Sequence, residues 1–330
     1  MRNKEVHLLE RPQGVPTLAQ FGIVEADVAE PAAGEFLVEN IFMSVDPAMR
    51  PRLAAQTPLN EAMGGGAIGR VIKSRHADFK EGEYVESMQG FRQYFTSGGK
   101  GTSKLDPAGM PLAACMSVLG LTGLTAYGGI LVTAALKDGE SVFVSAAAGA
   151  VGSVAAQIAK IKGCYVIGSA GSDDKCNWLK HDLGLDAVIN YKKQELRAAL
   201  KTAAPRGIDV YFDNVGGEHL NAALPRMNAL GRIAICGMIS AYNNFGALSE
   251  PVTTLSNMIY NRLTMRGFVF YEFEPLRAQF LADMRRWLKE GRMQYRTTVL
   301  QGIERAPAAL IGLFSGANTG KMLVQLAKDD

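Results

Sequence analysis

The pattern of hydrophobic and polar positions changes near residue 120. Before that point, short extended apolar stretches such as residues 35–42 and 69–74 are broken by proline and glycine, which predicts a small β-rich domain. Beyond it, apolar strands alternate with helical patterns, which indicates βαβ units and a parallel sheet. We therefore predict two domains of different class, one over residues 1–120 joined by the C-terminal segment 296–330, and one over residues 121–295.

Six apolar runs in the second region predict strands. They are Ser141–Ala147, Cys164–Ala170, Ala187–Asn190, Asp209–Asn214, Gly231–Gly237 and Leu263–Phe270. Six parallel strands suit a doubly wound fold that binds a dinucleotide. A helix over Pro275–Glu290 closes this region, because proline at its start and Gly291 just past its end are typical helix boundaries. A short strand over Lys321–Leu326 follows and could return to the first domain.

A glycine turn follows the first of these strands and precedes an amphipathic helix. It contains Gly149, Ala150, Val151 and Gly152. Small residues here let the backbone approach a pyrophosphate, Gly152 lets helix and strand pack closely, and free N–H groups at the helix start attract anionic oxygens. Glycine turns after strands are also common for purely structural reasons. The strand and helix around this one favour a dinucleotide site.

The end of the second strand bears on the choice between NAD and NADP, because a carboxylate there normally binds the ribose hydroxyls of NAD. Residues 166–172 contain no acid before Asp173 and Asp174. Lys175 follows at once and could neutralise a 2′-phosphate, and Tyr191 after the third strand could add a hydroxyl donor. NADP is favoured. The alternative is that Lys175 is a solvated helix residue and that the two aspartates are N-caps.

The composition points to a small-molecule partner. Hydrophobic residues make up 48% and charged residues 20%, and the net charge is +3 without a long basic run, so neither nucleic acid nor a membrane surface is expected as a partner. The N-terminus lacks the apolar stretch of a signal peptide, and no segment offers about 18 uninterrupted apolar residues. We expect a cytoplasmic protein with reduced cysteines.

The residues that usually bind zinc are dispersed along the chain. They are Cys115, Cys164, Cys176 and Cys236, together with His7, His76, His181 and His219. Catalytic zinc needs a close set of such ligands, and no Cys-x-x-Cys occurs. We expect no metal, and each histidine is more simply a surface or loop residue. Alcohol–ketone interconversion would then lack its usual source of carbonyl polarisation.

Four motifs in order carry a family likeness. They are Ala146–Ser153, Ala170–Lys175, Tyr211–Gly217 and Gly231–Ser240. Together they resemble the zinc-independent medium-chain dehydrogenases/reductases, and within them the leukotriene B4 12-hydroxydehydrogenase/prostaglandin reductase group with its 2-alkenal reductases and curcumin-reductase-like enzymes. The resemblance runs from Ser44–Arg50 to Gly316–Lys321. It implies an α/β protein with a GroES-like N-terminal domain, a Rossmann domain, and a cleft between them for nicotinamide and substrate.

The resemblance also implies roles for individual residues. Gly149–Gly152 would hold the pyrophosphate of NADP(H), Lys175 and Tyr191 its 2′-phosphate, and Asn214 the adenosine side. The nicotinamide end would be lined by Cys236, Gly237, Met238, Ile239, Ser240, Tyr242, Phe268, Val269, Phe270 and Asn318. A homodimer through the edge of the Rossmann sheet follows by analogy.

The chain departs from its group in the first domain, where it has Asp46-Pro-Ala48-Met-Arg50 instead of the common Asp-Pro-Tyr-Met-Arg. Losing that aromatic ring should reshape the substrate pocket. Arg50 could steer a substrate carboxylate or anchor a domain interface. Tyr260, with Met258, Ile259 and Met265, could meet a hydrophobic substrate, meet another subunit, or belong to the core. Residues 243–251 are expected to form a mobile loop.

A pocket without zinc can still reduce an activated C=C bond. Hydride goes to the β-carbon, and negative charge spreads to the carbonyl oxygen, where a hydrogen-bond donor stabilises it. The resemblance suggests Tyr242 as that donor, although a loop tyrosine is more often a packing or surface group. The leading hypothesis is an NADPH-dependent enone and enal reductase. The alternatives are an NADPH:quinone oxidoreductase and a non-catalytic NADPH-binding protein.

Overall fold

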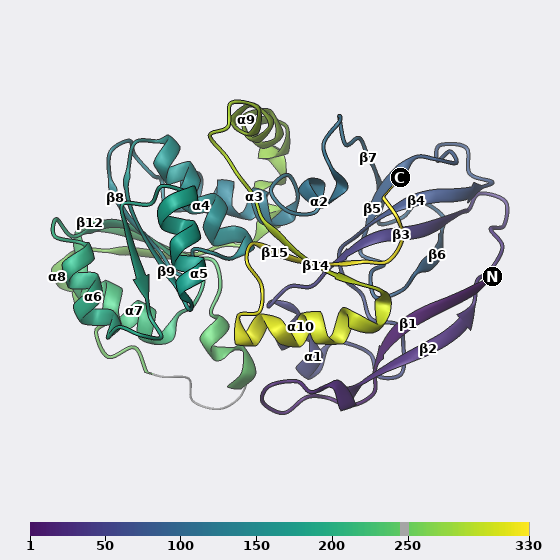
Figure 1. Ribbon diagram of the computed structural model, residues 1–330, viewed down its shortest axis with the longest axis horizontal. Helices are drawn as coiled ribbons and strands as arrows, with labels where there is room; N and C mark the ends of the chain where they lie inside the picture. The colour runs from purple at the N-terminus through teal and green to yellow at the C-terminus, as the bar shows by residue number, and fades with distance from the viewer. Residues whose placement is uncertain (245–250, 330) are drawn as a thin grey trace. The chain divides into compact units, whose positions relative to one another are not determined.

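The computed structural model describes residues 1–244 and 251–329 (Figure 1). The part of the expected mobile loop at residues 245–250 lies outside the described residues. The chain divides into two compact units. The first comprises Met1–Met116, Thr297–Asn318 and Met322–Asp330, and the second comprises Ser117–Arg296 and Thr319–Lys321.

The first unit is built on antiparallel strands. They are β1 (Arg2–Leu8), β2 (Phe21–Asp27), β3 (Phe36–Ser44), β4 (Ala67–Ser74), β5 (Tyr84–Ser87), β6 (Tyr94–Ser97), β7 (Thr102–Leu105), β14 (Thr297–Gln301) and β15 (Lys321–Gln325). Strands β1 and β2 pair alone, while the main sheet has the order β14-β15-β3-β4-β5-β7, with β6 also paired to β3. Because β15 pairs antiparallel with β3, the expectation that the C-terminal strand returns to the first region is confirmed.

Three α-helices accompany these strands among the described residues. They are α1 (Met49–Ala55), α2 (Leu112–Cys115) and α10 (Ala306–Ser315). Helix α10 has Pro307 in its first turn and ends at Gly316, whose left-handed φ of 75° suits glycine. Leu310 of α10 is fully buried in one core cluster with Val6 of β1 and Val324 of β15, so the two ends of the chain share a core.

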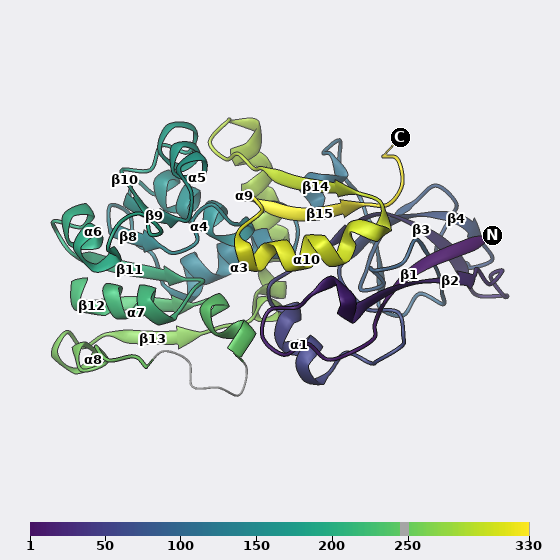
Figure 2. The same cartoon turned by 60° about the horizontal axis from the view of Figure 1, so that its bottom comes forward.

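The second unit contains a six-stranded parallel sheet with the order β10-β9-β8-β11-β12-β13. Its strands are β8 (Ser141–Val144), β9 (Tyr165–Ala170), β10 (Ala187–Asn190), β11 (Ile208–Asp213), β12 (Met227–Ile235) and β13 (Thr264–Gly267). In sequence terms this is the order 3-2-1-4-5-6 of a doubly wound dinucleotide fold, so the predicted fold class is confirmed. Figure 2 shows β13 as the outer strand of the sheet.

Helices cover both faces of this sheet. They are α3 (Leu121–Gly128), α4 (Ala150–Ile161), α5 (Asp173–Asn177), α6 (Leu196–Ala203), α7 (Gly217–Ala223), α8 (Asn257–Tyr260) and α9 (Arg277–Lys289). On one face Phe143 and Tyr211 share a core cluster with Leu200 of α6 and Leu220 of α7. On the other face a Cβ at Gly129, which follows α3, would lie 2.8 Å from the Phe212 ring. Glycine there lets this helix pack directly on the sheet.

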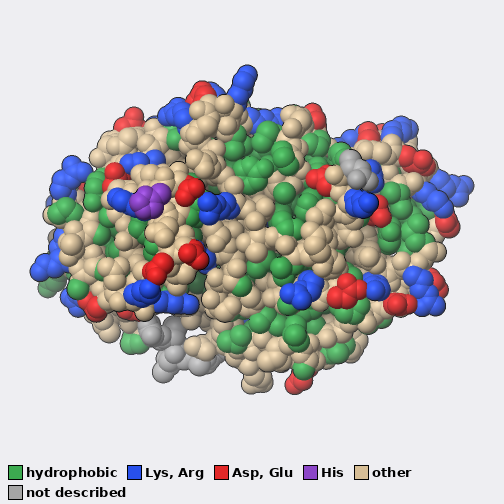
Figure 3. Space-filling model, viewed as in Figure 1, with side chains coloured by type: hydrophobic (Ala, Val, Ile, Leu, Met, Phe, Trp, Pro, Cys, Tyr) green, Lys and Arg blue, Asp and Glu red, His purple; other side chains and the backbone are tan. Residues whose placement is uncertain are grey.

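The surface mixes both signs of charge. Lysine and arginine alternate with aspartate and glutamate over the face in Figure 3, without an extended field of one sign. This agrees with the small net charge of +3. Within the described part of the chain, no helix is long and apolar enough to cross a membrane.

Candidate functional site

The predicted glycine turn connects β8 to α4. Ala146 has the left-handed φ of 48°, which reverses the chain, and the N–H of Gly149 donates to its carbonyl at 2.9 Å. A Cβ at Gly152 would lie 2.4 Å from the same Ala146 oxygen, closer than real Cβ atoms come. Glycine at position 152 therefore lets α4 start tightly against the turn, as predicted from the sequence.

The first turn of α4 presents backbone N–H groups suited to an anion. Helix geometry gives the amides of Ala150, Val151 and Gly152 no intrahelical acceptor. Their N-cap is Gly149, and no side chain of the described residues caps it. Such a helix start is a common site for phosphate oxygens.

A segment far along the chain holds the other side of this turn through Gly320, whose role was not predicted from the sequence. The N–H of Gly320 donates to the Ala148 carbonyl at 2.8 Å, and Gly149 and Gly320 form an isolated parallel bridge. Gly320 has a φ of 66°, and a Cβ there would lie 1.9 Å from the Arg296 carbonyl. The motif Gly316–Lys321 was noticed in the sequence, but a glycine needed for its backbone conformation has no periodic pattern to reveal it.

Beyond β9, the side chains of Tyr191 and Lys192 lie over the backbone of Gly171. A Cβ added to Gly171 would lie 2.8 Å from the Tyr191 hydroxyl oxygen and 3.2 Å from the Lys192 Cε. Lys175 is half-buried nearby, and burial together with the positive charge of Lys192 lowers the pKa of its ammonium group. Lys192 is the residue that the sequence analysis did not single out here. Its position directly after Tyr191 was the available signal.

The two acids of this region do not take the N-cap position. The hydroxyl of Ser172 caps α5 by accepting from the Lys175 N–H at 3.4 Å. The Asp173 carboxylate accepts from Asn190 at 2.8 Å and pairs with Lys193, and the hydrogen bond to Lys193 is the main cause that lowers the pKa of this carboxyl. The alternative reading of the aspartates as N-caps was therefore wrong. The acid nearest the end of β9 is neutralised by a lysine, which fits a phosphorylated ribose better than a free one.

A buried carboxylate organises the carboxyl end of β11. Oδ1 of Asp213 accepts from Ser145 Oγ at 3.0 Å, from the Tyr211 hydroxyl at 2.6 Å, and from the N–H groups of Val215 and Gly216 at 2.8 and 2.9 Å. Its Oδ2 has no partner among the described residues. Burial raises the pKa of this carboxyl above its ordinary value, although the four donors oppose that shift. Asp213 thereby ties the glycine turn to the turn after β11, a role that the sequence analysis missed.

Asn214 and Tyr242 lie next to this carboxylate network. The side-chain amide of Asn214 donates to the Ser145 carbonyl at 2.7 Å. The Tyr242 hydroxyl accepts from the Met238 N–H at 3.3 Å, and a Cβ at Gly237 would lie 3.1 Å from it. Burial is the main cause that raises the pKa of Tyr242, so its phenol keeps a proton to donate at neutral pH.

The rest of the segment after β12 is held by backbone contacts. The N–H groups of Cys236 and Gly237 donate to the Asp213 carbonyl at 2.8 and 3.1 Å. Burial raises the pKa of the Cys236 thiol to about 12, so it is not a thiolate nucleophile. The N–H of Ile239 donates to the Asn214 carbonyl at 3.3 Å, and Ser240 Oγ donates to the Val215 carbonyl at 2.6 Å.

The three residues predicted after β13 differ in their surroundings. Phe268 is buried, with its ring against Phe212, and a Cβ at Gly129 would lie 2.4 Å from it. Its side chain therefore belongs to the core. Val269 and Phe270 are partly exposed, and Asn318 is half-buried in the first unit.

The predicted substrate residues lie in contrasting environments. Arg50 is only 2% exposed and donates to the backbone carbonyls of Pro12 and Gly14, so its guanidinium clamps a loop of the first unit. Tyr260 is 81% exposed at the end of α8, beside the equally exposed Ile259. The apolar group around Tyr260 is therefore divided, because Met258 and Met265 pack against the core.

No group of three or more His, Cys, Asp or Glu side chains is placed to hold a metal within residues 1–244 and 251–329. The reading of every histidine as a surface or loop residue was wrong for His219. This side chain is 3% exposed on α7, is hydrogen-bonded to Ser169 Oγ at 3.1 Å, and lies edge-on to the Tyr191 ring at 5.0 Å. Burial lowers its pKa to about 4.

A parallel sheet of this order, with a glycine turn, an uncapped helix start and a lysine-rich end of β9, is typical of a dinucleotide-binding protein. Comparison with family models agrees. Residues 4–105 match the N-terminal domain of oxidoreductase, and residues 150–289 match zinc-binding dehydrogenase.

Individual relatives cover nearly the whole chain. Prostaglandin reductase 1 of Bos taurus is 43% identical over 94% of this chain and 95% of its own. The NADP(+)-dependent 2-alkenal reductase of Nicotiana tabacum is 38% identical over 99% of this chain and 98% of its own. The crystal structure of CurA in complex with NADPH from Vibrio vulnificus is 37% identical, with a TM-score of 0.93 over 98% of this chain and 99% of that one. The chain belongs to the medium-chain dehydrogenases/reductases, in the zinc-independent group of the prostaglandin and 2-alkenal reductases.

Proposed function

We propose that this chain reduces the C=C bond of α,β-unsaturated ketones and aldehydes with NADPH. The observation that carries the reaction is the half-buried Tyr242 hydroxyl, which lies just beyond β12 against Met238 and keeps its proton. The names of the relatives, a prostaglandin reductase and a 2-alkenal reductase, support the same class of substrate.

NADP(H) is the cofactor, and the residues fit it. The first-turn amides of α4 would bind the pyrophosphate, and Lys175, Tyr191 and Lys192 the 2′-phosphate. The tight contact between Gly152 and the Ala146 carbonyl supports the pyrophosphate assignment, because a side chain at position 152 would displace the turn. When bound, NADPH supplies the hydride.

The remaining predicted contacts stay part of the proposal. Asn214 would lie on the adenosine side. The nicotinamide end would be lined by residues 236–240, Tyr242, the segment Phe268–Phe270 and Asn318. Since Phe268 is a core side chain, its backbone is the part available to a ligand. We assign nucleotide binding to residues 121–295, and substrate binding to residues 1–120 with the segment 296–330.

Tyr242 would donate a hydrogen bond to the substrate carbonyl oxygen as negative charge develops there. The phenol is protonated across the neutral range at its ordinary pKa, and burial, which raises that pKa, leaves it so. The α-carbon then receives a proton from this tyrosine or from water. Arg50 and Tyr260 are kept as candidate substrate residues, with Arg50 acting through the loop that it clamps.

The loss of NADPH absorbance across a panel of enones, enals, quinones and simple ketones tests this function. We expect turnover with enones and enals and little with simple ketones. Turnover with quinones alone would favour the quinone oxidoreductase instead. Tight NADPH binding without any turnover would favour a non-catalytic NADPH-binding protein.

We also infer a homodimer formed through β13. This strand ends the parallel sheet, and its residues Thr264 and Arg266 are exposed, so its outer edge can pair with another copy. Ile259 and Tyr260 are 76% and 81% exposed. Replacing Ile259 with Asp should therefore dissociate the dimer in light-scattering measurements without unfolding the subunit. A wild-type monomer would contradict the inference.

A further inference from the structure

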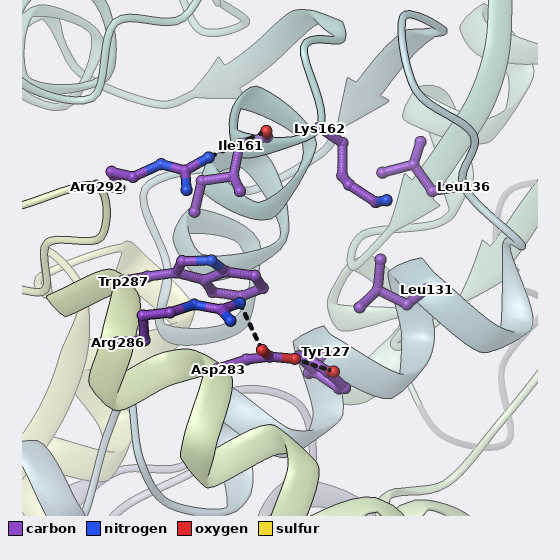
Figure 4. A pocket seen from close by; sticks show the side chains of 9 residues that line it. All are labelled: Tyr127, Leu131, Leu136, Ile161, Lys162, Asp283, Arg286, Trp287 and Arg292. Atoms are coloured by element: carbon purple, nitrogen blue, oxygen red, sulfur yellow. Dashed lines mark hydrogen bonds and ion pairs between the residues drawn. The ribbon is translucent and has the colours of Figure 1, made fainter. Parts of the chain in front are cut away.

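A cavity of about 510 Å³ lies in the second unit, away from the glycine turn. It is lined by Tyr127, Leu131, Leu136, Ile161, Lys162, Asp283, Arg286, Trp287 and Arg292 (Figure 4). Ile161 and Lys162 belong to the C-terminal end of α4, whereas the glycine turn precedes its N-terminus. A helix of 12 residues spans about 18 Å, so this cavity is separate from the cofactor site. We call it the α4 end pocket.

The lining of the α4 end pocket combines five apolar or aromatic side chains with four charged ones. In Figure 4, Trp287 and Ile161 form one side and Leu131 and Leu136 the opposite side, with the Tyr127 ring below them. Trp287 is 6% exposed and its ring is therefore fixed by packing. A volume in this range is typical of small-molecule sites.

The acid in the lining is already satisfied. The Asp283 carboxylate accepts from the Tyr127 hydroxyl at 2.7 Å, from Gln279 at 3.1 Å and from Arg286 at 2.6 Å. Burial and this hydrogen bond to Asp283 raise the pKa of Tyr127 above its ordinary value, so the Tyr127 phenol keeps its proton near neutral pH. The Asp283 carboxylate in the lining therefore does not favour a cationic ligand.

The rim of the pocket carries two cations with weakly held partners. Lys162 pairs with Asp138 at 2.8 Å and Arg292 pairs with Glu290 at 3.3 Å, and neither carboxylate belongs to the pocket lining. Arg292 also donates to the Ile161 carbonyl at 3.4 Å. All four side chains are at least a third exposed, and such surface pairs contribute little. A ligand anion can therefore compete for both cations.

We propose that the α4 end pocket binds an amphiphilic carboxylate with an unbranched apolar chain. Its carboxylate would pair with Lys162 and Arg292, and its chain would lie between Trp287 and the two leucines. A cationic ligand would be repelled by this rim, and a neutral apolar ligand would leave the rim unused. This proposal does not depend on the reductase function.

Calorimetric titration of the full chain with decanoate tests the proposal, with tryptophan fluorescence, to which Trp287 contributes, as a second signal. Decanol, which lacks the charge, and butyrate, which lacks the chain, should both bind more weakly. The double variant Lys162→Gln, Arg292→Gln should weaken decanoate binding by about tenfold or more, since each cation provides a charge-assisted hydrogen bond. Lys289→Gln, an exposed charge on the same helix α9 and outside the lining, should change nothing.

Leu131→Trp provides a test independent of charge, because the larger ring would fill the pocket and should abolish binding. NADPH binding by each variant reports that the unit is folded. Saturable decanoate binding that both pocket variants impair supports the proposal. Decanoate binding that neither variant changes, decanoate binding that NADPH displaces competitively, or no binding at millimolar concentrations would overturn it.

Discussion

The glycine turn at residues 146–152 and the segment at residues 236–244 both follow strands of the same sheet, but they are held in different ways. The turn is fixed by backbone contacts so close that a single Cβ at Gly152 has no room. The second segment is held by a few hydrogen bonds, including that of Ser240 Oγ to Val215 at 2.6 Å, and it presents side chains. At the turn, the proposed pyrophosphate binding would therefore depend on backbone shape, whereas the proposed chemistry would depend on one side-chain group, the Tyr242 hydroxyl.

The largest expected effect is that of removing the Tyr242 hydroxyl. We expect Tyr242→Phe to lower kcat for enone reduction by about 10²- to 10³-fold, because one donor to a developing oxyanion contributes roughly 3–4 kcal/mol. NADPH affinity should be nearly unchanged. Steady-state kinetics and NADPH titration measure the two quantities, and Tyr271→Phe removes an exposed hydroxyl as the control. An unchanged kcat would remove Tyr242 from the mechanism.

A substitution in the glycine turn should instead lower NADPH affinity. We expect Gly152→Ala to weaken NADPH binding by about 30- to 150-fold, since forcing a methyl group into a filled space costs roughly 2–3 kcal/mol. Gly267→Ala is the matched control, because a Cβ there meets nothing within 4 Å. Equal NADPH affinity in the two variants would mean that the turn can relax around the added methyl group. It would contradict the inference that cofactor binding depends on the backbone shape of this turn.

The strands around these two segments were predicted from the sequence with different success. The run Ala187–Asn190 was predicted to the residue, because a short apolar strand bounded by polar residues is a local signal. Strand β12 begins at Met227, four residues before the predicted start, because Gly231 was taken as its boundary although it lies inside the strand. Local patterns therefore indicated the elements better than their ends.

The missed site residues act across long sequence distances. Gly320 binds the turn around Ala148 from more than 170 residues away, and Asp213 reaches Ser145 across 68 residues. Such contacts leave no periodic trace in the sequence. The return of the C-terminal strand to the first region was predicted, but local patterns did not indicate that β15 would pair with β3.

The pH dependence of the free energy of unfolding would show whether the proposed nucleotide-binding unit also depends on a buried side chain, His219. The pKa of His219 falls from 6.5 to about 4 in the folded protein, so stability is complete above pH 6.5 and is lost as the pH falls toward 4. Between pH 7 and pH 5 we expect a loss of about 2 kcal/mol in the free energy of unfolding from this residue. Urea denaturation of the wild type and of His219→Gln measures it.

The variant should lose less stability than the wild type over that interval, because glutamine does not titrate. His181→Gln removes an exposed histidine and serves as the control. Parallel pH profiles for the wild type and His219→Gln would show that the histidine does not cause the acid sensitivity. His219 contacts Tyr191 and Ser169, so any acid loosening should reduce NADPH affinity before it alters Tyr242.

The smallest expected effect concerns Lys192, which would make the proposed site bind NADPH more tightly than NADH. Lys192→Gln should weaken NADPH binding by about tenfold, the value of one charge-assisted hydrogen bond, and leave NADH binding unchanged. Lys201→Gln on α6 carries the same change of charge on an exposed residue and separates contact from general electrostatics. A loss shared by NADPH and NADH would assign Lys192 to support of the Gly171 backbone. A loss confined to NADPH would support a direct contact of Lys192 with the 2′-phosphate, beside those proposed for Lys175 and Tyr191.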